Sequence, residues 1–130
     1  MRKPTKKQLD KIAMDLWHKK GYEKWGNVCV VCGSVGCVGH HYVPRSRSTL
    51  LKYDVINYVP LCHNFSGRKC HYRVHNSKEP DVVRAICDKI REVRGKEWCD
   101  YIEEKRQDRT TSFYTVSWLE SQIEKLREEK

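Results

Sequence analysis

The cysteines of this chain fall into spaced pairs, and their spacing limits the fold more than any other feature of the sequence. Cys29 and Cys32 are separated by two residues, whereas Cys62 and Cys70 are separated by seven. A Cys-x2-Cys pair forms a tight turn that directs two thiolates at one ion, and a second pair from a distant segment completes a tetrahedral zinc site. The longer spacer makes the second pair the weaker signal. We therefore expect a structural zinc ion held by Cys29, Cys32, Cys62 and Cys70.

Two further residues are alternative ligands for this zinc, namely Cys37 and His63. We expect Cys37 to pack beside a strand as a small apolar side chain, and Cys87 and Cys99 to do the same on later helices, because free cysteine is among the residue types most often buried. The total of seven cysteines is odd, which argues against complete disulfide pairing. The first residues are basic and no apolar run follows them, so we expect a cytoplasmic protein with reduced thiols.

Four further histidines lie close to these cysteines in the sequence. His71 and His75 are four residues apart, so on a helix they share one face and both imidazoles can reach one ion. The alternative interpretation of His71 and His75 is that both are solvated side chains on a basic helix, with no metal between them. His40 and His41 are adjacent, and adjacent side chains on a strand point to opposite faces. The two therefore have different tasks, one as a metal ligand and the other facing a substrate.

The charge of the chain indicates an acidic polymer as its partner. Lys and Arg number 26 against 17 Asp and Glu, which gives a net charge of +9 and a pI near 9.3. Such a balance is typical of nucleic-acid-binding proteins, although a lysine-rich surface that serves only solubility is the alternative. No apolar run approaches the ~18 residues of a membrane span, so we expect no membrane partner. The candidate phosphate contacts, each of which could equally be a solvated side chain, are Arg45, Arg47 and Arg73.

The apolar pattern predicts one α+β domain over residues 1–130, organised in three parts. Residues 1–27 carry an N-terminal helix, residues 28–79 the zinc knuckles with short strands and a histidine-bearing helix, and residues 80–130 a helical extension. The chain is long enough to bury one core, and its sequence contains no internal repeat.

Local signals set the expected boundaries of these elements. Thr5 and Gln8 have the spacing of a capping box, and Gly21 is expected to end the helix that follows. Residues 45–52 show no periodicity and are expected to form a loop, and residues 58–61 a short strand. One helix should begin near Cys70, and another at Pro80 or the residue after it.

Three segments, taken together, resemble the HNH nucleases of the His-Me finger group, which carry a ββα-metal motif. The resemblance runs from Cys29 to His75 and rests on residues 39–44 (GHHYVP), 57–62 (NYVPLC) and 70–75 (CHYRVH). More loosely, residues 95–98 (GKEW) and a final helix with Leu119 are similar to phage recombination endonucleases of the NinG type. In the spacer between the second cysteine pair the sequence departs from the family, which commonly has two residues there.

The resemblance implies a metal-dependent endonuclease that hydrolyses DNA phosphodiester bonds, from a phage or prophage, acting in DNA recombination or processing in a bacterial cytoplasm. His41 matches the general base, and Asn57 matches the residue that accepts a hydrogen bond from the other ring nitrogen of that base. One catalytic ion, Mg²⁺, Mn²⁺, Ni²⁺ or Zn²⁺, is expected at the remaining three histidines: His40, His71 and His75. Ligand softness favours Zn²⁺, Ni²⁺ or Mn²⁺ over Mg²⁺ at imidazoles.

Elementary chemistry supports these roles. The oxygens of a phosphodiester are anionic, so a cation near them favours attack, and histidine has an ordinary pKa of about 6.5 that suits removal of a proton from water.

The alternative function is a non-catalytic zinc-ribbon module that binds nucleic acid and uses every cysteine and histidine for structural metal. An adaptor acting through the C-terminal helices is a third interpretation, and those helices also offer a surface for a dimer. Apolar stripes at helical spacing more often pack inward.

Overall fold

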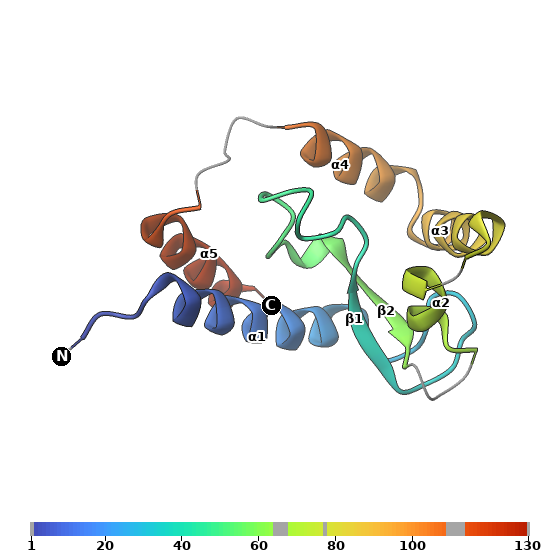
Figure 1. Ribbon diagram of the computed structural model, residues 1–130, viewed down its shortest axis with the longest axis horizontal. Coiled ribbons are helices and arrows are strands. Elements are labelled where there is room, and N and C mark those ends of the chain that lie inside the picture. The colour runs from blue at the N-terminus through green and yellow to red at the C-terminus, as the bar shows by residue number, and fades with distance from the viewer. Residues whose placement is uncertain (1, 64–67, 77, 109–113, 130) are drawn as a thin grey trace.

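A two-stranded antiparallel sheet lies between helices in this α+β fold, seen in a computed structural model that describes residues 2–63, 68–76, 78–108 and 114–129. Strands β1 (Cys37–His41) and β2 (Tyr58–Cys62) are connected by a long loop that ends in a 3-10 turn, η1 (Val55–Asn57). Within these residues the helices are α1 (Lys6–Trp25), α2 (Cys70–Asn76), α3 (Pro80–Arg94), α4 (Lys96–Gln107) and α5 (Val116–Glu128) (Figure 1). None of the helices in the described part combines the length and apolar character that a membrane span requires.

The strand register sets which histidine faces which helix. His40 lies opposite Val59, and His41 lies opposite Tyr58. Because side chains alternate along a strand, His40 faces α2 while His41 faces α1, and Figure 1 shows these helices flanking the strand pair. The prediction that the two histidines point in different directions is confirmed.

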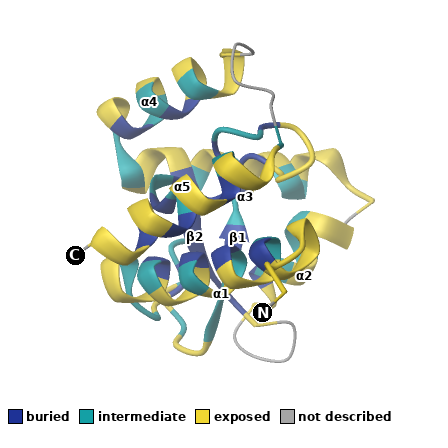
Figure 2. Ribbon diagram, turned by 90° about the vertical axis from the view of Figure 1, so that its left-hand side faces the viewer, coloured by how far each residue is buried: buried dark blue, intermediate teal, exposed yellow. Residues whose placement is uncertain are grey.

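Two clusters of buried side chains hold the helices on the strands, and Figure 2 shows the burial of β2 and of the inward helix faces. The first cluster joins β2 to α3 and α4 through Ile86, Ile90, Trp98 and Ile102. The second joins α1 to α5 through Leu9, Ala13, Trp17, Leu119, Ile123 and Leu126. The apolar stripe of the last helix therefore packs inward against α1, as expected. Because this stripe is buried, it is not a surface through which an adaptor could bind a partner.

Helix α1 continues through Gly21, and the prediction that it ends there is wrong. The helix stops at Gly26, whose φ of 85° lies in the region that glycine tolerates best. A Cβ at Gly21 would lie only 2.1 Å from the Tyr58 ring, and one at Gly39 only 2.4 Å from it. The two glycines thus leave room for the ring of Tyr58, which lets α1 approach β1 closely.

Most of the other predicted boundaries are confirmed. Residues 45–52 form turns without helix or strand, and the expected strand at 58–61 is β2. The capping box at Thr5 is present, α2 begins at Cys70, and α3 begins at Pro80. In the segment 28–43 the strand pairing consists of β1 and an isolated bridge between Val28 and Val35.

Candidate metal centres

Four cysteine sulfurs converge at the base of the strand pair. The Sγ atoms of Cys29, Cys32, Cys62 and Cys70 all lie within 4.8 Å of one another, and no disulfide joins them. At a Zn–S distance of about 2.3 Å, two sulfurs of a tetrahedral site are about 3.8 Å apart. The Sγ atoms of Cys32 and Cys62 are 3.7 Å apart. The arrangement fits a tetrahedral zinc ion.

The backbone around these cysteines is folded to present the sulfurs. The amide of Gly33 donates to the carbonyl of Cys29 over 2.9 Å, which closes the turn of the first pair. In the second pair the amide of Cys70 donates to the Sγ of Cys62 over 3.1 Å. Cys70 is the first residue of α2, so the helix itself brings this sulfur back to β2 across the seven-residue spacer.

The protonation of the thiols also depends on their surroundings. Burial raises the pKa of Cys29 and Cys70, because a thiolate loses its hydration there. Burial acts in the same direction on Cys32, but hydrogen bonds that involve the Ser34 side chain and backbone, the Arg68 backbone and Cys29 together outweigh it and hold the pKa at about 6. A bound divalent cation would favour the thiolate form at all four positions.

The two alternative ligands lie outside the four-sulfur cluster of the described residues. Cys37 lies across the strand pair from Cys62 and packs against the first buried cluster, with its Sγ 3.5 Å from the carbonyl of Ser34. His63 is exposed, and its amide donates to the carbonyl of Gly36. Cys99 also packs against the first cluster, as expected of a small apolar side chain, whereas Cys87 is half-buried on α3 and belongs to neither buried cluster of the described residues.

Three histidines form a second cluster directly beside the first. One ring nitrogen from each of His40, His71 and His75 lies within 4.8 Å of the others. The rings of His71 and His75 stand 4.7 Å apart between centroids, one helical turn from each other on α2. His40 is buried, whereas His75 is exposed, so the cluster is closed on the strand side and open to solvent on the other. Three nitrogens with one open side can hold a divalent ion that keeps a free coordination position.

Burial keeps two members of the histidine cluster, His40 and His71, in the form that binds metal. The pKa of His40 falls to about 3, first because the ring is buried and then because His75 and His71 face it. Burial also lowers the pKa of His71, with His75 adding to the effect. Neutral imidazole has a free nitrogen lone pair, which is what a metal ligand needs.

His41 is held on the opposite face of β1 by two contacts. Its Nε2 lies 2.9 Å from the Lys52 carbonyl oxygen, and because a carbonyl can only accept, Nε2 must carry the proton. Its ring stacks on Trp17, with centroids 3.8 Å apart and planes at 7°. Burial lowers the pKa of His41 to about 4, against the opposing effect of the Lys52 carbonyl. The ring is therefore neutral at pH 7, with Nδ1 free to accept a proton.

Asn57 does not bond directly to His41, and the prediction of a hydrogen bond between their side chains is wrong. The Asn57 side chain is fully buried and bonds the loop between the strands. Its Oδ1 accepts from the Val43 amide over 2.9 Å, and its Nδ2 donates to the carbonyls of Val43 and Leu51 over 3.0 and 3.3 Å. Since Leu51 precedes Lys52, Asn57 fixes the loop segment whose carbonyl holds His41.

One cleft of about 430 Å³ connects the histidine cluster with His41 around the edge of β1. Its walls come from α1, β1, the loop after β1, and α2. The sequence did not single out the α1 residues, because Met14 and His18 continue an ordinary helical pattern. The lining consists of Met14, His18, Gly39, His40, His41, Pro44, Arg45, Ser46, His71 and His75.

The three predicted arginines are placed differently around this cleft. Arg45 lines it. Arg47 is exposed in the same turn, where its amide donates to the Pro44 carbonyl, and Arg73 is half-buried on α2 outside the described lining. Only Arg45 is therefore brought together with the histidines.

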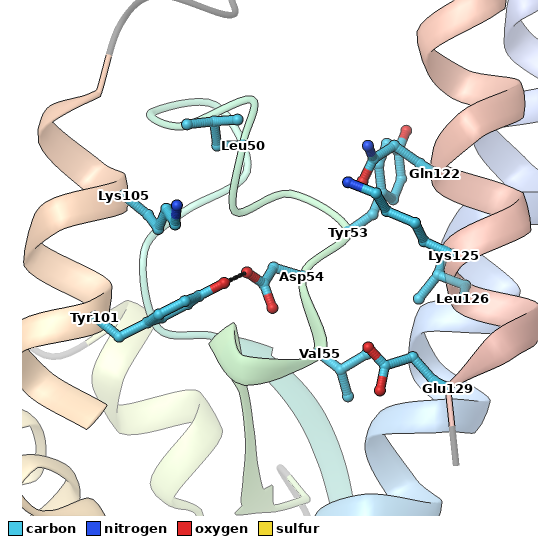
Figure 3. Close-up of a pocket in the computed structure, with 10 residues that line it drawn as sticks. All are labelled: Leu50, Tyr53, Asp54, Val55, Tyr101, Lys105, Gln122, Lys125, Leu126 and Glu129. Carbon is cyan, nitrogen blue, oxygen red and sulfur yellow. Dashed lines mark hydrogen bonds between the residues drawn. The ribbon is translucent and has the colours of Figure 1, made fainter. Parts of the chain in front are cut away.

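A second cavity, of about 260 Å³, lies between α4, α5 and the loop that connects the strands (Figure 3). The hydroxyl of Tyr101 donates to the Asp54 carboxylate there, and Lys105 and Lys125 line it from the two helices. None of the predicted site residues lines this cavity within the described chain, so it is separate from the metal centres.

Comparisons with protein-family models, curated proteins and solved structures find no match to this chain.

Replacing Asn57 tests its role as a clamp on the loop. Asn57→Ala leaves buried backbone groups of Val43 and Leu51 without partners, and we expect the free energy of unfolding to fall by about 3 kcal/mol. Asn76→Ala is the control, because that exposed side chain donates to the Tyr72 carbonyl of its own helix and its loss should cost less than about 0.5 kcal/mol. Urea unfolding of the zinc-loaded variants measures both, and equal stability of Asn57→Ala and the parent would show that the clamp is unimportant.

Replacing one clustered and one unclustered cysteine tests the four-sulfur site. Cys29→Ser should lose tightly bound zinc and unfold at a markedly lower temperature, because structural zinc contributes folding free energy directly. Cys37→Ser, which alters a thiol outside the cluster, should keep its zinc. Atomic absorption after dialysis and thermal unfolding by circular dichroism provide the readouts. A folded Cys29→Ser protein with the zinc content of the parent would contradict the assignment.

Proposed function

We propose that this protein is a metal-dependent endonuclease that hydrolyses phosphodiester bonds in DNA, with His41 as the general base. One observation carries the proposal. A three-histidine cluster and a neutral, oriented histidine open into the same cleft from opposite faces of one strand. Hydrolysis of a phosphodiester needs these two elements, a cation and a base, on different sides of the reacting phosphate.

A divalent ion held by His40, His71 and His75 would supply positive charge against the phosphate oxygens. The three ligands are neutral imidazoles, so they leave the full charge of such an ion in place. The exposed position of His75 keeps the solvent side of the cluster accessible to a substrate. The donor set suits Zn²⁺, Ni²⁺ or Mn²⁺ better than Mg²⁺ on ligand softness.

His41 would take the proton of the attacking water at Nδ1. As the water oxygen bonds to phosphorus, the ester oxygen on the other side departs and is protonated by solvent. The Lys52 carbonyl fixes the tautomer and would stabilise the imidazolium that forms. Trp17 fixes the ring plane, so the base is oriented before the substrate binds.

The order of the elements supports a ββα-metal assignment of the HNH type. One candidate ligand comes from β1 and two come from α2, and β2 lies between them in the sequence. The four sulfurs at the start of α2 would hold a structural zinc that fixes this helix. A phage or prophage origin, action in DNA recombination and a bacterial cytoplasm follow from the looser NinG-type likeness and belong to the same proposal.

DNA is the proposed substrate because the chain is positively charged and an arginine lines the cleft. Arg45 lines the cleft, Arg47 lies in the same turn, and the net charge of the chain is +9. The alternative, a non-catalytic zinc-ribbon module, would use the histidines to close a second structural site. The open side of the cluster and the separate placement of His41 favour the nuclease.

His41→Ala tests the general base. We expect kcat for the cleavage of supercoiled plasmid to fall by about 10²- to 10⁴-fold, because proton transfer from water is lost. Binding of the divalent ion proposed at His40, His71 and His75 should be unchanged. His75→Ala is the matched comparison, since it should lose both cleavage and that ion.

The outcomes separate the hypotheses. Full metal-dependent cleavage by His41→Ala would show that the base is misassigned. If the parent protein cleaves no supercoiled, linear or branched DNA with Mg²⁺, Mn²⁺, Ni²⁺ or Zn²⁺ and holds two inert zinc ions, the binding module is correct.

A further inference from the structure

The cleft has a wall that the proposed catalytic steps do not use. His18 on α1 and the loop residues Arg45 and Ser46 line it together with His41. A cleft of about 430 Å³ is in the size range of sites that enclose a whole small ligand, so groups beyond the catalytic ones are available to hold the substrate.

We propose that His18, Arg45 and Ser46 form a phosphate-binding subsite that holds a backbone phosphate next to the one that is cleaved. This inference rests on the proposed function and extends it to α1, outside the segment that carries the metal-ligand motifs. It makes the N-terminal helix part of the substrate-binding surface.

His18 is held in place by the same aromatic residue that holds the base. Its ring meets the edge of Trp17, with centroids 4.9 Å apart and planes at 78°, while His41 stacks on the face of Trp17. His18 also lies over Gly39, where an added Cβ would be 3.0 Å from its Nδ1. The two imidazoles therefore both contact one indole, and both line the cleft.

The electrostatics of this wall suit an anion. Partial loss of hydration lowers the pKa of His18, and the positive charge of Arg45 adds to the effect against the opposing influence of Asp15. Asp15 lies on α1 outside the described lining and is paired with Lys11 over 2.9 Å. The cleft is lined by no carboxylate among the described residues, so a bound anion would meet the charge of Arg45 and the N–H of His18 with no fixed negative charge beside it.

The donors match the chemistry of a phosphodiester. An imidazole N–H, a guanidinium fork and a hydroxyl are common partners of phosphate oxygens, and contacts of this kind position nucleic acid without reading its bases. We therefore expect the subsite to act on DNA of any sequence.

Binding measurements on the zinc-loaded protein test the subsite independently of cleavage. The probe is a short fluorescein-labelled DNA duplex in buffer without added divalent ion, so that the DNA stays intact, with Kd taken from fluorescence anisotropy. His18→Ala and Arg45→Ala should each raise Kd by about tenfold. His18→Gln should recover part of the loss, because the amide still donates a hydrogen bond. Lys19→Ala is the control, since it removes a neighbouring exposed charge outside the described lining and should change Kd by less than about twofold.

The double variant shows whether both side chains hold one phosphate. If they do, the combined loss in His18→Ala/Arg45→Ala is smaller than the product of the single losses, because the second change removes a contact that is already weakened. Arg45→Ala should also reduce the slope of log Kd against log salt by about one.

Two results overturn the inference while leaving the nuclease proposal intact. Both require that the parent binds and cleaves DNA. The first is a His18→Ala protein that binds DNA with the Kd of the parent. The second is a double variant whose increase in Kd equals the product of the two single increases. A parent that neither binds nor cleaves DNA removes the proposed function itself, and the subsite with it.

Discussion

The convergence of four cysteine sulfurs at the start of α2 is the constraint on which the rest of the site depends. Two of the sulfurs come from the turn before β1, one from the end of β2 and one from the first residue of α2. His71 follows Cys70 directly, so the contact that fixes the sulfur also fixes the rotation of the helix. His71 and His75 are thereby directed at His40, and two candidate metal centres stand back to back across a single peptide bond.

The other side of the cleft depends on packing rather than on metal ligands. Trp17 is fully buried in the second core cluster and donates its indole N–H to the Asp54 carbonyl over 2.8 Å. It reaches His41 because Gly21 and Gly39 let α1 and β1 approach across the Tyr58 ring. The N-terminal helix is therefore an integral part of the site, through the base it supports and the cleft wall it provides.

Local spacing in the sequence predicts the two candidate ligand sets, whereas the roles of Asn57, Gly21 and His18 depend on tertiary contacts. The helical interval between His71 and His75, the strand alternation of His40 and His41, and the paired cysteines are properties of short segments, so the sequence shows them directly. The partners of Asn57 are backbone groups of a loop, which carry no sequence signature. The role of Gly21 depends on the Tyr58 ring, which packs against α1 from a distant strand, so the sequence alone suggests a helix end instead. The role of His18 depends on a cleft that forms only in the folded chain, so its position in the sequence gives no signal.

We propose that α2 begins with the last ligand of one metal centre, Cys70, and continues with two ligands of another, His71 and His75. X-ray absorption on the purified protein, loaded first with zinc and then with cobalt as a spectroscopic probe, measures this most directly. The account predicts zinc in an all-sulfur shell at about 2.3 Å and cobalt in a separate shell of nitrogen and oxygen without sulfur. A single ion with mixed sulfur and nitrogen ligands, or cobalt that enters only by displacing zinc from sulfur, would contradict it.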